Sequence, residues 1–202
     1  MAQGKQAKIL TGANIARMLR EVEASRYPLR DRVTVLLSVR AGLRAKEIAM
    51  VTWSMVLDAD GNVGDVLEVH NGASKGEKGG RQVPLHPELR RALVELQAHD
   101  KPETSARIVR GERDGTVNRK SVGTFFARLY MRLGLKGCSS HSGRRTFVTG
   151  LAKRIVAAGG SLRDVQQLAG HTSLQTTQRY IEGNSDAKRS AIEALGKRRV
   201  SG

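Results

Sequence analysis

Apolar residues recur three or four positions apart along most of the chain, which is the spacing of one face of an α-helix. The first such segment places Ile15, Met18 and Val22 on its inner face, and Thr11 stands where a helix-capping residue is expected. Further helices are predicted from Pro28 to Gly42, over residues 44–51, from Pro87 onward, from Asn118 to Leu133, over residues 141–158, from a capping box of Ser161 and Asp164 to Gly170, and from Thr172 or Ser173 to Tyr180.

Three short β-prone runs interrupt the helical pattern in the middle of the chain. They are Trp53–Leu57, Val66–His70 and Gln82–Leu85, separated by the turn sequence DADGN and by the glycine-rich stretch NGASKGEKGG. This arrangement favours a small sheet with one lysine-bearing hairpin. The predicted fold class is α+β, mainly α with a small antiparallel three-stranded β-sheet.

The composition indicates the kind of partner. The 202 residues fit one ordinary domain, and 35 Lys and Arg against 19 Asp and Glu give a formal net charge of +16. A polyanion is the simplest partner for such an excess, and nucleic acid is the commonest polyanion. The three Phe, three Tyr and one Trp are too few to favour an RNA-binding module that stacks bases on aromatic rings.

Several other classes are disfavoured. The single cysteine, Cys138, cannot form an internal disulfide or a cysteine-based zinc site. No stretch is apolar enough for a signal peptide or a membrane span, and no GxxxxGK[ST] motif indicates nucleotide hydrolysis. We therefore expect a cytoplasmic, nucleoid-associated protein with no membrane partner.

Four separated clusters of polar residues could carry chemistry. Arg44 and Glu47 share a helix face, a lysine lies in the glycine-rich hairpin, a His-x-x-Arg pair begins at residue 141, and a histidine at 171 precedes Tyr180. Taken singly, each has an ordinary explanation, such as a surface ion pair, a flexible turn or a half-buried tyrosine. Their order along one chain is what makes them informative.

That order resembles the tyrosine recombinase, or phage-type integrase, family across residues 11 to about 182. The matching stretches are AGLRAKEIAMVTW, SKGEKGGRQVPL, HSGRRTFVTGLA and LAGHTSLQTTQRY. The last is the most specific, with a Leu-x-Gly-His segment and a tyrosine nine positions after the histidine. The resemblance implies the catalytic-domain fold of that family and its Arg-Lys-His-Arg-His/Trp-Tyr set, here Arg44, Lys75, His141, Arg144, His171 and Tyr180.

The resemblance also implies a reaction on double-stranded DNA. Tyr180 would attack a phosphodiester, form a 3′-phosphotyrosyl bond and release a 5′-hydroxyl, with no metal or ATP as cofactor. Arg44 and Arg144 would stabilise the charge on the phosphate oxygens, because a guanidinium matches phosphate geometry and stays protonated. His171 would donate a further hydrogen bond to the phosphate.

The family also implies how protons move. A tyrosine has an ordinary pKa of about 10, so it needs a base, and His141 is the candidate. Lys75 is the candidate acid for the departing 5′-oxygen, with Lys78 as a rival because the hairpin matches the family only if one extra glycine is allowed. We expect Glu47 to orient Arg44 or a histidine rather than to touch DNA.

The chain also departs from the family motif. Gly143 and Arg145 stand where a leucine and a histidine often flank the second arginine, and we expect the glycine to loosen the helix by about 1 kcal/mol relative to alanine. Basic residues expected to contact DNA are Lys46, Lys78, Arg81 and Arg145.

The expected organisation has three parts. Residues 1–10 form a flexible basic lead, residues 11–182 the catalytic domain, and residues 183–202 a tail. In related proteins a C-terminal helix passes to a neighbouring subunit in a ring of four on DNA, so residues 186–195 could mediate a homo-tetramer, or they could be a frayed basic tail. Accessory DNA-bending factors are possible partners. The chain begins almost directly at the catalytic domain, so we expect either a naturally short member or an excised domain.

Two alternatives stay open. Residues 162–181 resemble a helix-turn-helix, so the chain could be a DNA-binding regulator without catalysis, although that would leave the first two clusters and the His-x-x-Arg pair unexplained. A type IB topoisomerase uses almost the same residues to relax supercoils, but the short length and the Leu-x-Gly-His segment favour recombination.

Overall fold

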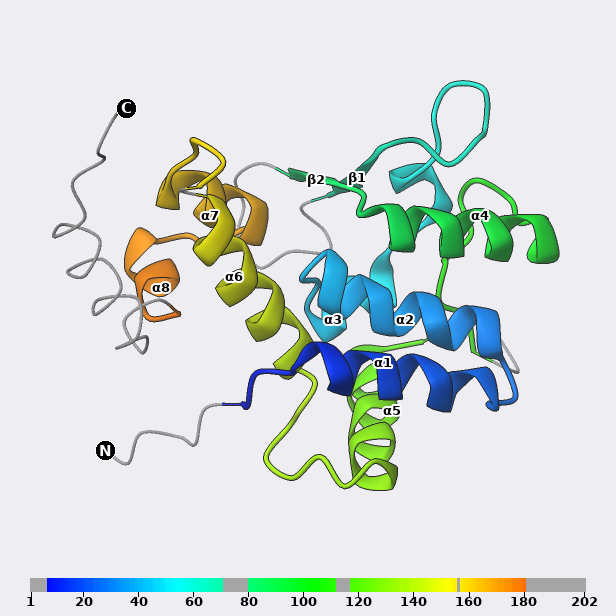
Figure 1. The fold of residues 1–202 in the computed structure, drawn as a ribbon. Coiled ribbons are helices and arrows are strands. Elements are labelled where there is room, and N and C mark those ends of the chain that lie inside the picture. Colours follow the sequence, from blue (N-terminus) through cyan, green and yellow to red (C-terminus); the bar gives the residue numbers. More distant parts are fainter. Residues whose placement is uncertain (1–6, 71–79, 112–116, 156, 181–202) are drawn as a thin grey trace, which may run out of the picture.

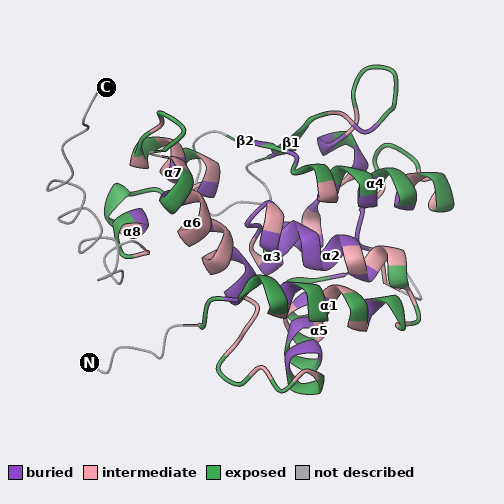
Figure 2. Ribbon diagram, in the orientation of Figure 1, coloured by how far each residue is buried: buried purple, intermediate pink, exposed green. Residues whose placement is uncertain are grey.

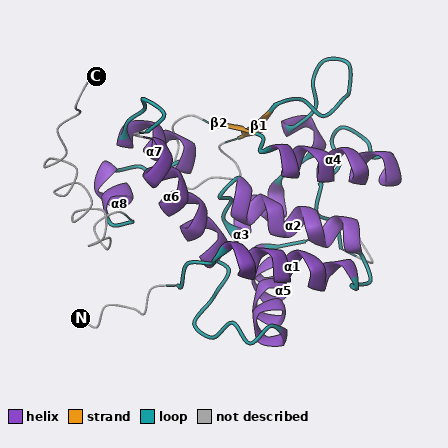
Figure 3. Ribbon diagram, in the orientation of Figure 1, coloured by secondary structure: helices purple, strands orange, loops and turns teal. Residues whose placement is uncertain are grey.

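The computed structural model describes residues 7–70, 80–111, 117–155 and 157–180, and most of them are helical (Figures 1 and 3). The helices are α1 (Gly12–Glu23), α2 (Pro28–Arg40), α3 (Ala45–Met50), the short 3-10 helix η1 (Trp53–Met55), α4 (Pro87–Asp100), α5 (Arg119–Arg132), α6 (Ser142–Ile155), α7 (Leu162–Ala169) and α8 (Leu174–Gln178), and the strands are β1 (Val66–Val69) and β2 (Arg81–Pro84). None of the helices in these ranges is long and apolar enough to cross a membrane.

Helix α2 is the centre of the main core. It contacts α1, α3, α4 and α6, and Val33, Leu36 and Leu37 are fully buried (Figure 2). Val35 and Ser38, on other sides of the helix, are also fully buried. A helix that is buried nearly all round belongs to the interior of a domain, so the elements around α2 are positioned by it.

Side-chain caps fix where several helices begin, as predicted. The hydroxyl of Thr11 and the amide oxygen of Asn118 each accept a hydrogen bond from the backbone N–H three residues later, at 3.1 and 3.0 Å. At α7 the Asp164 carboxylate accepts from the backbone N–H of Ser161 at 2.7 Å. These bonds satisfy N–H groups that the helix itself leaves free.

The sheet differs from the prediction. Strands β1 and β2 pair antiparallel, with Val66 opposite Pro84, but the expected strand over Trp53–Leu57 is wrong. That run curls into η1, where the N–H of Val56 donates to the carbonyl of Trp53 at 2.9 Å. The physical reason is burial: Trp53, Met55 and Val56 all lie inside, and an alternating strand cannot bury two successive residues on one face.

Helices α6 and α7 have a small apolar core of their own. It consists of Val148, Ala152, Val165 and Ala169, with Tyr180 packed against its edge. Helix α6 joins this part to the main core, because its first turn packs on α2. A Cβ placed on Gly143 would lie 2.1 Å from the Ser38 hydroxyl oxygen, so Gly143 lets the two helices approach closely instead of only loosening α6.

Replacing Gly143 with alanine is expected to lower the free energy of unfolding by about 1–3 kcal/mol, because the added methyl group overpacks the contact with Ser38. Urea unfolding measures this change. Gly150→Ala on the same helix is the control. A Cβ there meets only the end of the Arg154 side chain, at 3.4 Å, so this variant should equal or exceed wild-type stability. Equal stability of both variants would contradict the close contact.

The outer parts of the expected organisation are only partly described. Residues 7–10 lie against the body: the N–H of Leu10 donates to the Thr146 hydroxyl at 2.8 Å, and the Leu10 side chain is buried. Residues 1–6, the segment 71–79 and the expected tail 183–202 lie outside the described residues.

Candidate active site

The turn between α2 and α3 positions the first arginine. Gly42 has a φ of +64°, which favours glycine, and the chain then enters α3 at Arg44. The Glu47 carboxylate folds back over this helix start, where Oε2 accepts from the Arg44 backbone N–H at 2.7 Å and Oε1 accepts from Arg44 Nη1 at 2.9 Å. Glu47 is thus buried against Arg44, whose side chain remains about one-third exposed, at 32%.

Arg81, the first residue of β2, binds the same carboxylate from the other side. Its Nη1 and Nη2 donate to Glu47 Oε1 and Oε2 at 3.0 and 2.9 Å. Burial acts to raise the pKa of Glu47, but hydrogen bonds and charge from Arg81 and Arg44 outweigh it, so the pKa lies below its usual range. Glu47 is therefore an ionised, buried carboxylate shared by two guanidinium groups.

Arg144 connects three segments around the site. It lies in the first turn of α6 and is 3% exposed. Nη1 donates to the carbonyl of Gly42 at 2.7 Å, and Nη2 donates to the carbonyl of Ala169 at the end of α7. Burial, with repulsion from Arg44, lowers the pKa of Arg144 to about 10, so the group stays protonated at neutral pH.

His171 follows the turn that ends α7. Gly170 makes this turn with a φ of +60°, and His171 Nδ1 lies 2.9 Å from the hydroxyl of Thr177 in α8. The imidazole stacks on the Tyr180 ring, with centroids 5.4 Å apart and planes at 18°. Because Nδ1 is held by Thr177, Nε2 is the ring nitrogen left to meet a substrate.

The two histidines are neutral for related reasons. Burial and the charges of Arg144, Arg44 and Arg81 lower the pKa of His171 to about 4. Burial, together with Arg119, Arg144 and Arg44, also lowers the pKa of His141. Both guanidinium groups of the motif therefore lie close enough to both imidazoles to repel a proton, and an unprotonated His141 is the form that accepts one.

Stability should fall in acid because of His171. Its ordinary pKa is 6.5 and its folded pKa is about 4, so the unfolded chain binds the proton more readily between these values. Lowering the pH from about 7.5 to about 5 is expected to remove about 2 kcal/mol of stability through this group. Urea unfolding at both pH values, compared with His171→Gln, measures the difference. An equally steep pH dependence in the variant would show that His171 titrates normally.

His141 and Tyr180 line one cavity of about 250 Å³, together with Arg145, Thr176, Arg179 and Ala7. Tyr180 is also near enough to Arg144 to influence its pKa. The structure thus brings together five of the six motif residues from α3, α6 and the region after α7. The sixth, Lys75, and its rival Lys78 lie outside the described residues.

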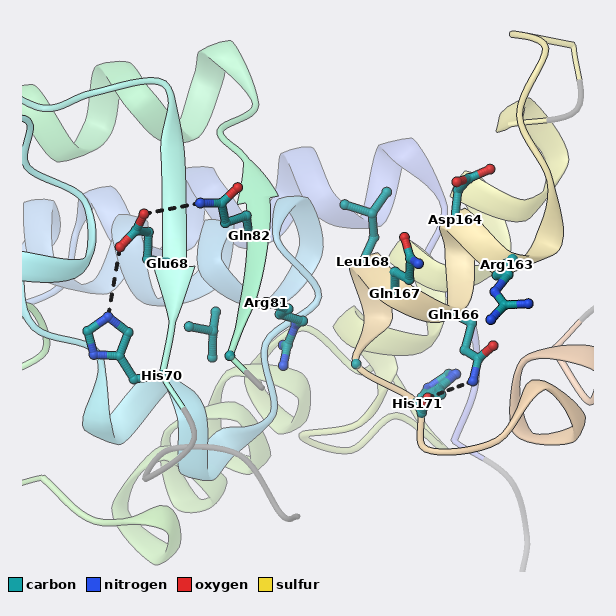
Figure 4. Close-up of a pocket in the computed structure, with 13 residues that line it drawn as sticks. Glu68, His70, Arg81, Gln82, Arg163, Asp164, Gln166, Gln167, Leu168 and His171 are labelled. Carbon is teal, nitrogen blue, oxygen red and sulfur yellow. Dashed lines mark hydrogen bonds and ion pairs between the residues drawn. The ribbon is translucent and has the colours of Figure 1, made fainter. Parts of the chain in front are cut away.

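A larger cleft of about 980 Å³ lies between the two strands and α7 (Figure 4). Its strand side carries Glu68, His70 and Arg81, and its other side carries Gln167 and His171. His70 and Gly80, which flank the segment containing the hairpin lysines, both line this cleft. The described residues on either side of Lys75 therefore both lie at the cleft that contains His171.

The basic residues expected to contact DNA occupy different environments. Lys46 is exposed on α3. Arg145 is half-buried and donates from Nη1 to the carbonyl of Ala7 at 2.9 Å. The Arg81 side chain is only 9% exposed, and both of its terminal nitrogens are engaged by Glu47, so the structure places it beneath the surface.

Two contributors to the site were not identified from the sequence. Thr177 holds His171, and its position three residues before Tyr180 was the available signal, because that spacing places both on one helix face. Gly170 provides the carbonyl that accepts from Arg44 Nη2 at 3.3 Å, and no local pattern indicates such a contact.

The family of the chain is shown by comparison with known sequences. The chain matches the Phage integrase family over residues 8–186 and belongs to that family. Tyrosine recombinase XerC of Pelobacter propionicus is 32% identical over 168 residues, covering 81% of this chain and 51% of the relative. Tyrosine recombinase XerD of Corynebacterium glutamicum is 30% identical over 171 residues, covering 82% and 52%. The chain spans about half the length of these curated relatives.

Solved structures show the same fold. The crystal structure of XerA recombinase aligns with a TM-score of 0.72 at 21% identity, covering 96% of this chain and 67% of that one. The Tn1549 transposon integrase in complex with transposon right end DNA aligns with a TM-score of 0.72 at 20% identity, covering 98% and 69%.

Proposed function

We propose that this chain is the catalytic domain of a site-specific DNA recombinase that cuts and rejoins strands through a 3′-phosphotyrosyl bond at Tyr180. The observation that carries this proposal is the convergence of two guanidinium groups, two neutral imidazoles and a phenol, contributed by segments far apart in the sequence. The net charge of +16 suits a DNA partner, and the matched Tn1549 integrase was solved with DNA.

The arginines would act on the phosphate. Phosphoryl transfer depends mainly on positioning and on stabilising charge at the non-bridging oxygens. Arg44 is partly exposed, and its Nη2 makes only a longer bond of 3.3 Å to Gly170, so it retains donors for a substrate. Arg144 is fixed by two backbone carbonyls and brings a buried positive charge to the same place. His171, oriented by Thr177, would add a hydrogen bond from Nε2.

The protons would move between the phenol and the departing oxygen. The Tyr180 oxygen forms a bond to phosphorus while the bond from phosphorus to the 5′-oxygen breaks. His141 accepts the phenol proton, and Lys75 or Lys78 gives a proton to the 5′-oxygen. In the second step another 5′-hydroxyl attacks the phosphotyrosine, the same bonds exchange in reverse, and no net energy source is needed.

The helix-turn-helix alternative has weaker support. It would use α8 as a recognition helix, but α8 has only five residues. Thr177 is fully buried and its hydroxyl is hydrogen-bonded to His171. The Tyr180 ring stacks on the same imidazole, so both side chains are occupied by contacts with His171.

The test is covalent trapping. The chain is incubated with nicked suicide duplexes made from the DNA that flanks its gene, and SDS-resistant adducts are separated on gels. An adduct that retains a label placed on the strand 5′ of the cut, whose 3′-phosphate is joined to Tyr180, and that forms at a preferred site, supports the proposal. A regulator would bind without forming an adduct, and a topoisomerase would relax plasmid DNA with no preferred site.

We further propose the arrangement in which this domain works. Residues 11–182 would form the catalytic domain, and the tail at 183–202 would link four copies on DNA, with accessory DNA-bending factors at some sites. The protein would then act at the nucleoid. Integration, excision or inversion of a mobile element are the reactions that such an assembly performs.

A further inference from the structure

Arg81 lies where three segments of the site meet, yet the reaction proposed above assigns it no step. It begins β2, it binds Glu47 at the start of α3, and its guanidinium lies against Gly170 after α7. A Cβ on Gly170 would lie 2.7 Å from Arg81 Nη1, so only a residue without a side chain leaves room for this contact.

The hydrogen bonds show which arginine is turned inward. Arg81 uses both terminal nitrogens on Glu47, and its Nε is buried with no partner among the described residues. Arg44 gives Nη1 and its backbone N–H to the same carboxylate, while its Nη2 makes a longer bond of 3.3 Å to the Gly170 carbonyl. Both terminal nitrogens of Arg81 are thus engaged by Glu47, and Arg44 is the arginine whose guanidinium is left partly free.

Without Arg81, the Glu47 carboxylate would keep only the backbone N–H and Nη1 of Arg44 as donors. Glu47 is 1% exposed, so water cannot replace a lost donor easily. Without Arg81, Glu47 would be expected to turn toward Arg44 and engage both of its terminal nitrogens, since bidentate pairing is the preferred geometry of a guanidinium with a carboxylate. In that arrangement Arg44 would have fewer hydrogen-bond donors left for the substrate.

We propose that Arg81 is a positioning residue, which fixes the Glu47 carboxylate and thereby sets the orientation of Arg44 beside His171. The inference rests on the proposed function for its kinetic consequence. Its structural consequence, the orientation of Arg44, does not depend on cleavage. This role also differs from a direct DNA contact, because a phosphate-binding arginine must expose its nitrogens.

Single-turnover cleavage of a suicide duplex at saturating DNA is the first measurement. Arg81→Gln is expected to cleave about 100-fold more slowly, a loss typical of one misplaced charge-stabilising donor, while the Kd for DNA changes less than twofold. Arg81→Lys keeps the charge and one hydrogen bond, so it should recover about tenfold of the loss. Arg40→Gln, which removes the Arg40–Glu88 ion pair outside the site, is the control and should cleave normally.

The double variant and the salt dependence separate the possible roles. If Arg81 acts through Glu47, Arg81→Gln combined with Glu47→Gln should cleave no more slowly than Glu47→Gln alone. The slope of log Kd against log salt should stay unchanged. A slope smaller by about 1 would instead make Arg81 a phosphate contact and overturn the proposal, as would wild-type cleavage by Arg81→Gln or additive losses in the double variant.

A third measurement needs no activity. In the free protein, the guanidinium NMR signals of Arg44 should shift in Arg81→Gln and in Arg81→Lys, and should stay in place in Arg40→Gln. Unchanged Arg44 signals in both Arg81 variants would overturn the proposal even if the wild type formed no adduct, so failure of the positioning role and failure of the proposed function are distinguishable. Arg81→Lys provides this result if Arg81→Gln does not fold.

Discussion

Replacing Tyr180 with phenylalanine is expected to abolish the SDS-resistant DNA adduct, with a loss of at least about 1,000-fold, because the attacking oxygen is removed and nothing else of the side chain changes. The phenyl ring can still stack on His171, as the tyrosine ring does at 5.4 Å. DNA affinity and thermal stability should therefore stay close to wild type. Gel analysis of trapped adducts and a DNA-binding titration measure the two quantities.

Tyr130→Phe is the matched control for this result. The Tyr130 hydroxyl is buried and has no hydrogen-bond partner in the part of the chain that the structure describes, and burial raises its pKa, so it is no candidate nucleophile. Its removal should leave adduct formation unchanged and stability unchanged or slightly improved. Recovery of wild-type adduct from the Tyr180 variant would refute the assignment of the nucleophile.

Replacing Arg144 is expected to impair both catalysis and folding. Arg144→Lys should slow cleavage by about 100- to 1,000-fold, since an ammonium presents its charge without the planar fork that suits phosphate. It should also lower stability by about 1–3 kcal/mol, because one amine cannot reach the carbonyls of both Gly42 and Ala169 as the guanidinium does. Single-turnover cleavage and urea unfolding measure the two effects.

Lys153→Gln, an exposed change near the other end of α6, controls for loss of positive charge on this helix. It should leave the cleavage rate at saturating DNA unchanged. If Arg144→Lys instead lost only DNA affinity and cleaved normally once bound, Arg144 would be a binding residue and not part of the charge stabilisation.

The sequence was a good guide where the information is local. Capping side chains such as Thr11 and Asn118 indicate where helices begin. The spacing from the Gly-His pair to Tyr180 identified the candidate nucleophile and its neighbouring histidine. Motifs could predict a candidate site because the chemistry limits which residue types can serve there, whatever surrounds them.

The sequence does not predict the environment of a residue whose contacts are distant along the chain. From the sequence, Arg81 is interpreted as a basic residue that contacts DNA. Its pairing with Glu47 is not visible there, because that carboxylate lies 34 residues earlier. From the sequence, Gly143 is expected only to loosen its helix. The close packing that it allows is not visible there, because its neighbour Ser38 belongs to α2. Only the tertiary structure supplies these partners.

The separate apolar core of α6 and α7 has a consequence for local stability around Tyr180. His171 and Tyr180 belong to a small subdomain with few buried side chains of its own, so its local opening should cost less free energy than global unfolding. Arg44 donates to the carbonyl of Gly170, and Arg144 in α6 donates to the carbonyl of Gly42, so these hydrogen bonds join the subdomain to the main body. A loosened subdomain would carry Tyr180 away from Arg44 while the main core stayed intact.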